Sequence, residues 1–109
     1  MGVTSVVAVS GDGADRASQA RADWGLTRLQ VAYGLTEDQM RDWGLFISKG
    51  IKEPESDVFN EPGMVLVRPD GTVYSAHVQS MPFARPHLDN LVASIGFIND
   101  NDYPARGEA

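Results

Sequence analysis

The stretch from Met64 to Val78 constrains the fold most, because it predicts a β-hairpin. Met64–Val67 is a continuous apolar run, and Thr72–Val78 is a second run rich in strand-forming residues. The four residues between them, Arg68-Pro69-Asp70-Gly71, have proline at the second and glycine at the fourth position of a turn. Two strands joined by so short a turn pair in an antiparallel manner.

An amphipathic helix is predicted after this hairpin. The link Ser80–Pro86 contains two prolines, and Pro86 suits the first turn of a helix. Apolar residues then recur with the spacing of one helix face, at Leu88, Leu91, Val92, Ile95 and Ile98. Residues 99–109 are predicted to form a polar tail.

The first part of the chain alternates strand and helix patterns. Thr4–Ser10 is short, β-branched and apolar on both faces, which is typical of an internal or parallel strand. A helix is predicted over Ala14–Trp24, with Asp12 as its N-terminal cap and Gly25 as its C-terminal cap. Leu29–Tyr33 is the next strand candidate.

A second, shorter helix is predicted from a capping box. Thr36 and Gln39 have the spacing in which each side chain bonds the other's backbone N–H, and the helix is expected to run to Trp43. The triplet Trp-Gly-Leu occurs at Trp24 and again at Trp43. We interpret it as one helix ending used twice, with each tryptophan packed on the core and each glycine at positive φ.

These elements predict an α/β protein with the order β-α-β(short)-α-loop-β-β-α. The 109 residues, 42% of them hydrophobic, suit a single domain over residues 1–109. The polar segment 48–60 is predicted to be a mobile loop.

Composition excludes several classes of function. Without cysteine the chain can form no disulfide, thiolate nucleophile or cysteine-bound zinc. The net charge is −6 and the nine Lys and Arg are scattered, which argues against a nucleic-acid surface. The apolar run Val6–Val9 is too short for a signal peptide or a membrane span, so we expect no membrane partner and a cytoplasmic location.

Several stretches resemble the peroxiredoxin-like (alkyl hydroperoxide reductase/thiol-specific antioxidant) branch of the thioredoxin-fold superfamily. The likeness is carried by SVVAVS at Ser5–Ser10, NEPG at Asn60–Gly63, VRPDGT at Val67–Thr72, QSMPFARP at Gln79–Pro86 and DYPARG at Asp102–Gly107. The resemblance covers nearly the whole chain and implies a thioredoxin-like fold.

The resemblance also implies what the chain lacks. In that family a strand and a helix carry the reactive cysteine, and this sequence resembles only the portion that follows them. We therefore expect no catalytic residue, no cofactor and no redox activity. The positions that match the pocket side of the family are Glu61, Pro62 and Arg85. Pro62 matches a proline that is commonly cis, although a trans proline opening a strand is equally compatible. For Arg85 a structural role in the link before the last helix is the alternative.

A thioredoxin-like domain without that strand and helix leaves strand edges and apolar surface open. We therefore expect a homodimer or a swapped oligomer, acting as a structural or interaction module. Two alternatives remain. The chain is a piece of a thiol peroxidase or disulfide oxidoreductase whose cysteine segment lies upstream, or it binds a small molecule in the vacated cleft.

Other candidate motifs have simpler explanations. Gly11-x-Gly13 follows a strand as a dinucleotide loop does, but Asp12 and Asp15 place negative charge where a pyrophosphate would lie, so a capped helix is favoured. His77 and His87 lack metal-ligand spacing. Asn99–Asp102 offers oxygen ligands without a calcium-loop pattern, and a solvated helix end is favoured.

Overall fold

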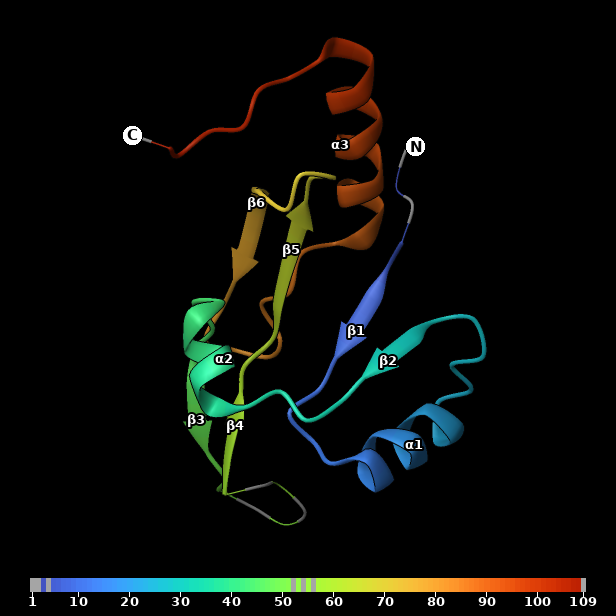
Figure 1. The fold of residues 1–109 in the computed structure, drawn as a ribbon, viewed down its shortest axis with the longest axis vertical. Helices are drawn as coiled ribbons and strands as arrows, with labels where there is room; N and C mark the ends of the chain where they lie inside the picture. Colours follow the sequence, from blue (N-terminus) through green and yellow to red (C-terminus); the bar gives the residue numbers. More distant parts are fainter. Residues whose placement is uncertain (1–2, 4, 52, 54, 56, 109) are drawn as a thin grey trace. The chain divides into compact units, whose positions relative to one another are not determined.

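A computed structural model describes residues 3, 5–51, 53, 55 and 57–108 of the 109-residue chain. The protein is mixed α/β, and the described residues form three helices and three two-stranded sheets (Figure 1). Residues 3–60 and 61–109 each form a compact unit, here called the N-terminal and C-terminal units. The single domain expected over residues 1–109 stays a prediction.

The N-terminal unit begins with a β-α-β motif. Strand β1 (Val7–Val9) pairs in parallel with β2 (Gln30–Ala32), and helix α1 (Ala14–Asp23) connects them (Figure 1). The pairing continues beyond the strands, because the Ser10 N–H donates to the Ala32 carbonyl at 2.9 Å. The prediction of a parallel strand within residues 4–10 is confirmed, although residue 4 lies outside the described residues.

The prediction that Asp12 caps helix α1 is wrong. Gly13 occupies the N-cap position with extended backbone angles, and no side chain caps the helix. The Asp12 carboxylate instead lies 3.7 Å from Nε of Arg16. The backbone N–H of Asp12 donates to Oγ of Ser10 at 3.0 Å. The residue with extended backbone angles is thus one position later than predicted, and as a glycine it has no side chain that could form the capping bond.

The capping box of helix α2 (Glu37–Asp42) is confirmed. Oγ1 of Thr36 accepts from the Gln39 N–H at 3.2 Å, and Oε1 of Gln39 accepts from the Thr36 N–H at 2.9 Å. Met40 packs inward from this helix and is buried. These two reciprocal bonds satisfy N–H groups that would otherwise lack partners at the helix start.

Helices α1 and α2 end in the same way, as the repeated triplet predicted. The N–H groups of Gly25 and Leu26 donate to carbonyls three and five residues earlier, at 3.2 and 3.0 Å. Gly44 and Leu45 repeat both bonds at 2.9 and 3.0 Å. This double bond pattern is the Schellman motif, and it requires the φ of 64° at Gly25 and 73° at Gly44.

The packing predicted for the two tryptophans is wrong. Trp24 is 74% exposed and Trp43 is 49% exposed. Each tryptophan is the C-cap residue of its helix. The Schellman bonds fix the backbone there without directing the side chain inward, and the inward positions of the two helices belong to Ala17 and Met40.

The loop predicted over residues 48–60 is shorter than expected. Strand β3 (Ile47–Lys49) pairs antiparallel with β4 (Val58–Asn60), so both ends of the segment are strand. The Gly50 N–H extends the ladder to the Asp57 carbonyl at 3.0 Å. Three-residue strands beside so many polar residues give too weak a pattern to recognise. Residues 52, 54 and 56 lie outside the described residues.

The C-terminal unit contains the predicted hairpin. Strand β5 (Gly63–Val67) pairs antiparallel with β6 (Val73–Val78). In the turn, the Gly71 N–H donates to the Arg68 carbonyl at 2.9 Å, and the Arg68 N–H donates to the Thr72 carbonyl at 2.8 Å. With Gly71 at φ 87°, this is a type I turn followed by a left-handed glycine.

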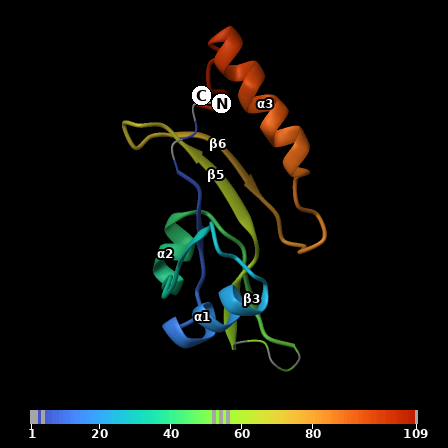
Figure 2. The same ribbon diagram turned by 90° about the vertical axis from the view of Figure 1, so that its right-hand side faces the viewer.

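Helix α3 (Leu88–Asn101) follows the hairpin and runs beside it (Figures 1 and 2). The helix begins after the predicted position, because Pro86 precedes the N-cap residue His87 and is not in the first turn. It also continues to Asn101, so the polar tail starts at Asp102 and not at residue 99. Asp102 has a left-handed φ of 47°, and the Tyr103 N–H donates to the Ile98 carbonyl at 3.1 Å.

Burial in the described residues is limited. Ala17 and Met40, each 4% exposed, are the buried hydrophobic residues among them, and both belong to the N-terminal unit. Within the same residues, no helix combines the length and the apolar character that a bilayer crossing requires.

Candidate functional site

The residues expected on the pocket side are placed as follows. Glu61 is buried two residues before β5, Pro62 is half-buried, and Arg85 is exposed. Nε of Arg85 donates to the Pro82 carbonyl at 2.9 Å, a hydrogen bond between two residues of the link before α3. This bond is the structural role weighed for Arg85 in the sequence. A pocket-side role for the three positions stays a prediction.

The other candidate residues do not assemble a metal centre in the part of the chain that the structure describes. No group of three or more His, Asp or Glu side chains there could hold a metal ion. His77 lies on β6 opposite Met64, and His87 is the N-cap of α3 without a side-chain capping bond. At the Gly11-x-Gly13 loop, the Asp12 carboxylate and Arg16 form an exposed pair across one helical turn.

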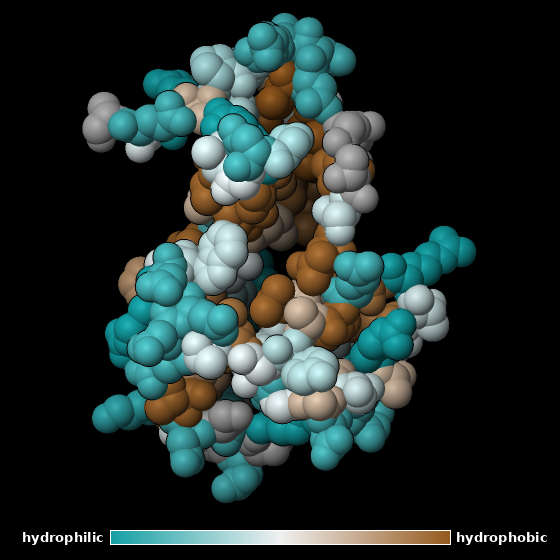
Figure 3. Space-filling view, in the orientation of Figure 1, coloured by the Kyte–Doolittle hydropathy of each residue, from teal (hydrophilic) through white to brown (hydrophobic). Residues whose placement is uncertain are grey.

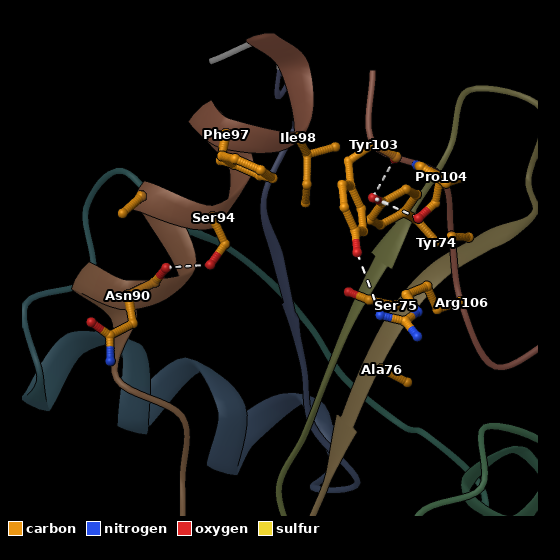
Figure 4. A pocket seen from close by; sticks show the side chains of 12 residues that line it. Tyr74, Ser75, Ala76, Asn90, Ser94, Phe97, Ile98, Tyr103, Pro104 and Arg106 are labelled. Atoms are coloured by element: carbon orange, nitrogen blue, oxygen red, sulfur yellow. Dashed lines mark hydrogen bonds between the residues drawn. The ribbon is translucent and has the colours of Figure 1, made fainter. Parts of the chain in front are cut away.

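The C-terminal unit instead contains a cavity that sequence analysis did not predict. It has a volume of about 720 Å³ and is lined by three segments: strand β6, helix α3 and tail residues 103–106 (Figure 4). That volume lies within the range of small-molecule sites, ~300–1,000 Å³. All of its lining residues belong to this one unit.

A hydrogen bond from strand to tail forms one wall of the cavity. The Tyr74 hydroxyl donates to the Tyr103 carbonyl at 2.6 Å and lies 3.4 Å from the Pro104 carbonyl (Figure 4). On the strand itself, the register passes from Leu66 opposite Ser75 to Val67 opposite Val73 and so skips Tyr74. A bulge of this kind re-aims a side chain, and bulges are common next to binding and active sites.

Three aromatic side chains, Tyr74, Phe97 and Tyr103, line the cavity. The Phe97 and Tyr103 rings lie 5.7 Å apart at 53°, a tilted arrangement that aromatic pairs favour. The guanidinium carbon of Arg68 lies 5.2 Å from the centre of the Tyr74 ring. Tyr74 is therefore held by its hydroxyl bonds to the tail and by a cation–π contact with its ring.

Arg106 is the charged residue among those lining the cavity. Its Nη1 lies 3.4 Å from the Tyr103 hydroxyl, next to Ser75 in Figure 4. No carboxylate of the described residues forms an ion pair with Arg106; the pairs found there are Arg16 with Asp12 and Arg41 with Glu37. Among the described residues, the guanidinium of Arg106 therefore has no carboxylate in ion-pair contact.

Most of the apolar face of α3 lies outside the cavity, although Ile98 lines it. Leu88 and Phe97 are nine positions apart, which at about 100° per residue places them on opposite sides of the helix. Phe97 lines the cavity, whereas Leu88 is 64% exposed and Val92 is 46% exposed. Figure 3 shows hydrophobic side chains, in brown, open to solvent where the hairpin and α3 lie. We call residues 88, 91, 92, 95 and 98 the α3 stripe.

Sequence reasoning missed the cavity because its walls are distant in the chain. Tyr74 and the carbonyl it contacts are 29 residues apart, and no local pattern connects them. The two tyrosines were visible, but nothing in the sequence indicated which partner each hydroxyl would find.

Comparison of the chain with family models, curated proteins and solved structures finds no match.

Proposed function

We propose that this chain is a cytoplasmic, peroxiredoxin-like protein of the thioredoxin-fold type that lacks redox activity and serves as a self-associating interaction module. The single observation that supports the proposal most is the open α3 stripe. The stripe belongs to the longest helix of the described residues, yet Leu88 and Val92 are exposed and its other three residues are only half-buried.

Energetics favour a partner for this helix. Isolated helices of about 12–15 residues are marginal in water, and most helical stability comes from packing of the apolar face. Helix α3 has 14 residues and no side-chain bond at its N-cap. Its formation therefore gains from any surface that covers Leu88 and Val92.

A second copy of the chain is the simplest such surface. In a two-fold arrangement the stripe of one copy packs on the stripe of the other, so that one patch supplies both sides. Leu, Val and Ile side chains along one helix face can interdigitate in this way. Each residue of the stripe then occurs twice in the interface, once from each copy, so a single substitution changes the interface at two places.

The redox part of the proposal follows from chemistry. Reduction of peroxides in the family that the chain resembles requires a thiolate, and the chain has no cysteine. We expect no thiol-dependent peroxide consumption by the purified protein. Peroxide consumption above that of buffer would contradict this part of the proposal and would leave the proposed self-association unaffected.

Sedimentation velocity over a range of protein concentrations tests the association. We expect a concentration-dependent dimer, weakened more than tenfold by Leu88→Glu, because an unpaired carboxylate would be buried in the interface. A glutamate in the first turn of a helix is favoured by the helix dipole, so the monomer should keep its fold.

Phe83→Glu is the matched control. It adds the same charge at an exposed apolar position of the same unit, outside α3. We expect the dimer of this variant to match that of the parent chain. A parent chain that stays monomeric at all concentrations, or equal weakening by both variants, would refute the role of the stripe.

A further inference from the structure

One wall of the cavity in the C-terminal unit is fixed by contacts of the Tyr74 side chain. The bulge at Tyr74 turns that side chain toward the tail, and its hydroxyl fastens the tail at Tyr103. The Arg68 contact holds the Tyr74 ring. The tail is therefore held beside β6 through one side chain, Tyr74, whose hydroxyl contacts the Tyr103 and Pro104 carbonyls.

The cavity has an apolar part that suits a flat, aromatic body. Phe97, Ile98 and the two tyrosines surround the space seen in Figure 4. Aromatic rings favour tilted or offset contacts with other rings at about 4.5–7 Å. The Ser94 hydroxyl donates to the Asn90 carbonyl at 2.7 Å, so its proton is already used in a hydrogen bond within α3.

The cavity also has one charged end. Arg106 is an exposed guanidinium in a chain of net charge −6, and no acid of the described residues pairs with it. A guanidinium presents a planar fork of N–H donors that matches the two oxygens of a carboxylate. The Tyr103 hydroxyl beside it can contribute a further hydrogen bond.

We propose that this cavity binds a small organic carboxylate with an aromatic body. The carboxylate pairs with Arg106, and the aromatic body lies against Phe97 and Tyr103. This site goes beyond self-association. It shares Ile98 with the α3 stripe, but neither Arg106 nor Phe97 belongs to the stripe, so substitutions at the charged end test it separately from the dimer.

Titration of the full chain with 2-naphthoate, followed by amide and side-chain NMR, tests the proposal. We expect shifts centred on Tyr74, Phe97, Ile98 and Tyr103. The neutral isostere 2-naphthamide keeps the ring system but cannot form the charge-assisted pair, so we expect it to bind about tenfold more weakly.

Two substitutions separate the charged end from the wall. Arg106→Gln should weaken 2-naphthoate about tenfold and leave 2-naphthamide nearly unchanged. Arg41→Gln, which removes the same charge from an exposed pair in the N-terminal unit, is its control and should change neither.

Tyr74→Phe should weaken both compounds, because it releases the tail while keeping the ring. Its control is Tyr33→Phe, at an exposed tyrosine of the N-terminal unit.

Several outcomes would overturn the proposal. Equal binding of naphthoate and naphthamide would remove the role of Arg106, and displacement by equimolar inorganic phosphate would remove the role of the aromatic body. Shifts centred on the hollow of about 450 Å³ that Arg21 and Arg28 line in the N-terminal unit would place the site elsewhere. Tighter binding of a peptide ending in phenylalanine would assign the cavity to a protein terminus and not to a small acid.

Discussion

Helices α2 and α3 show two different ways of specifying a helix. Helix α2 has six residues, a capping box at its start and a Schellman motif at its end. Helix α3 has 14 residues, a histidine N-cap without a side-chain bond and an aspartate in the left-handed position at its end. The short helix has its limits set by local hydrogen bonds, whereas the long one depends on its apolar face.

The two helices also differ in burial. Met40 of α2 is 4% exposed, while α3 has no fully buried residue. Caps therefore fix where a helix begins and ends, whereas burial of its apolar face supplies most of its stability. For α3, this stabilisation must come from a surface that covers the α3 stripe.

The largest expected effect comes from removing the burial of α2. Met40→Ala should lower the free energy of unfolding by about 2–5 kcal/mol, because it deletes buried side-chain volume and leaves a cavity. Urea denaturation followed by circular dichroism measures the change. Met81→Ala, at an exposed methionine, should stay within about 0.5 kcal/mol of the parent. Equal losses for the two variants would mean that Met40 does not anchor α2.

Breaking the local specification of α2 should cost less. Thr36→Ala removes one half of the capping box and should destabilise the protein by about 1 kcal/mol. Thr27→Ala, at an exposed threonine before β2, is the control and should be close to neutral. Amide exchange of the Gln39 N–H, measured by NMR, should accelerate in the first variant alone. An unchanged exchange rate would show that the capping bond contributes nothing.

Improving the end of α3 should make the two helices more alike. Asp102→Gly removes the cost of an aspartate at positive φ, as glycine already does at Gly44, and should stabilise by about 0.5–1 kcal/mol. Asp100→Gly, two positions earlier inside the helix, should destabilise by about 0.3 kcal/mol, the difference between the helix propensities of aspartate and glycine. Thermal unfolding of both variants checks the opposite signs. A loss in both would mean that Asp102 is not strained.

The smallest effect is a pH dependence in the hairpin turn. The side-chain hydroxyl of Thr72, and then its backbone N–H, donate to the Asp70 carboxylate at 2.6 and 2.9 Å and lower the pKa of that carboxyl below its ordinary value. A depressed pKa contributes stability above the unfolded-state pKa, and this contribution is lost as pH falls through the folded-state pKa. The Thr72 amide shift should therefore titrate at acid pH, and Asp70→Asn should abolish the titration. A midpoint at or above the ordinary aspartate pKa would contradict the bonds.

Sequence predicted the elements whose cause is local. The capping box at Thr36, the turn glycine at Gly71 and the paired endings at Gly25 and Gly44 each follow from a few adjacent residues. The mixed α/β class followed from their order along the chain. The thioredoxin-like order and the peroxiredoxin-like relation remain predictions, because they need more than local pattern.

What sequence did not predict depends on distant or weak interactions. Strands β3 and β4 have three residues each, and their pairing is decided by contacts across a polar segment. The exposure of Trp24 and Trp43 depends on which helix face meets its neighbours. The cavity requires Tyr74 to find a carbonyl 29 residues away.

The bond between Tyr74 and the tail has a consequence for proteolysis. A protease must draw an extended stretch of chain into its cleft, and the bond holds the tail just before Arg106. Trypsin should therefore cut after Arg106 only as often as that bond opens. The rate of this cleavage therefore reports how often the tail separates from β6, and Tyr74→Phe should increase that rate.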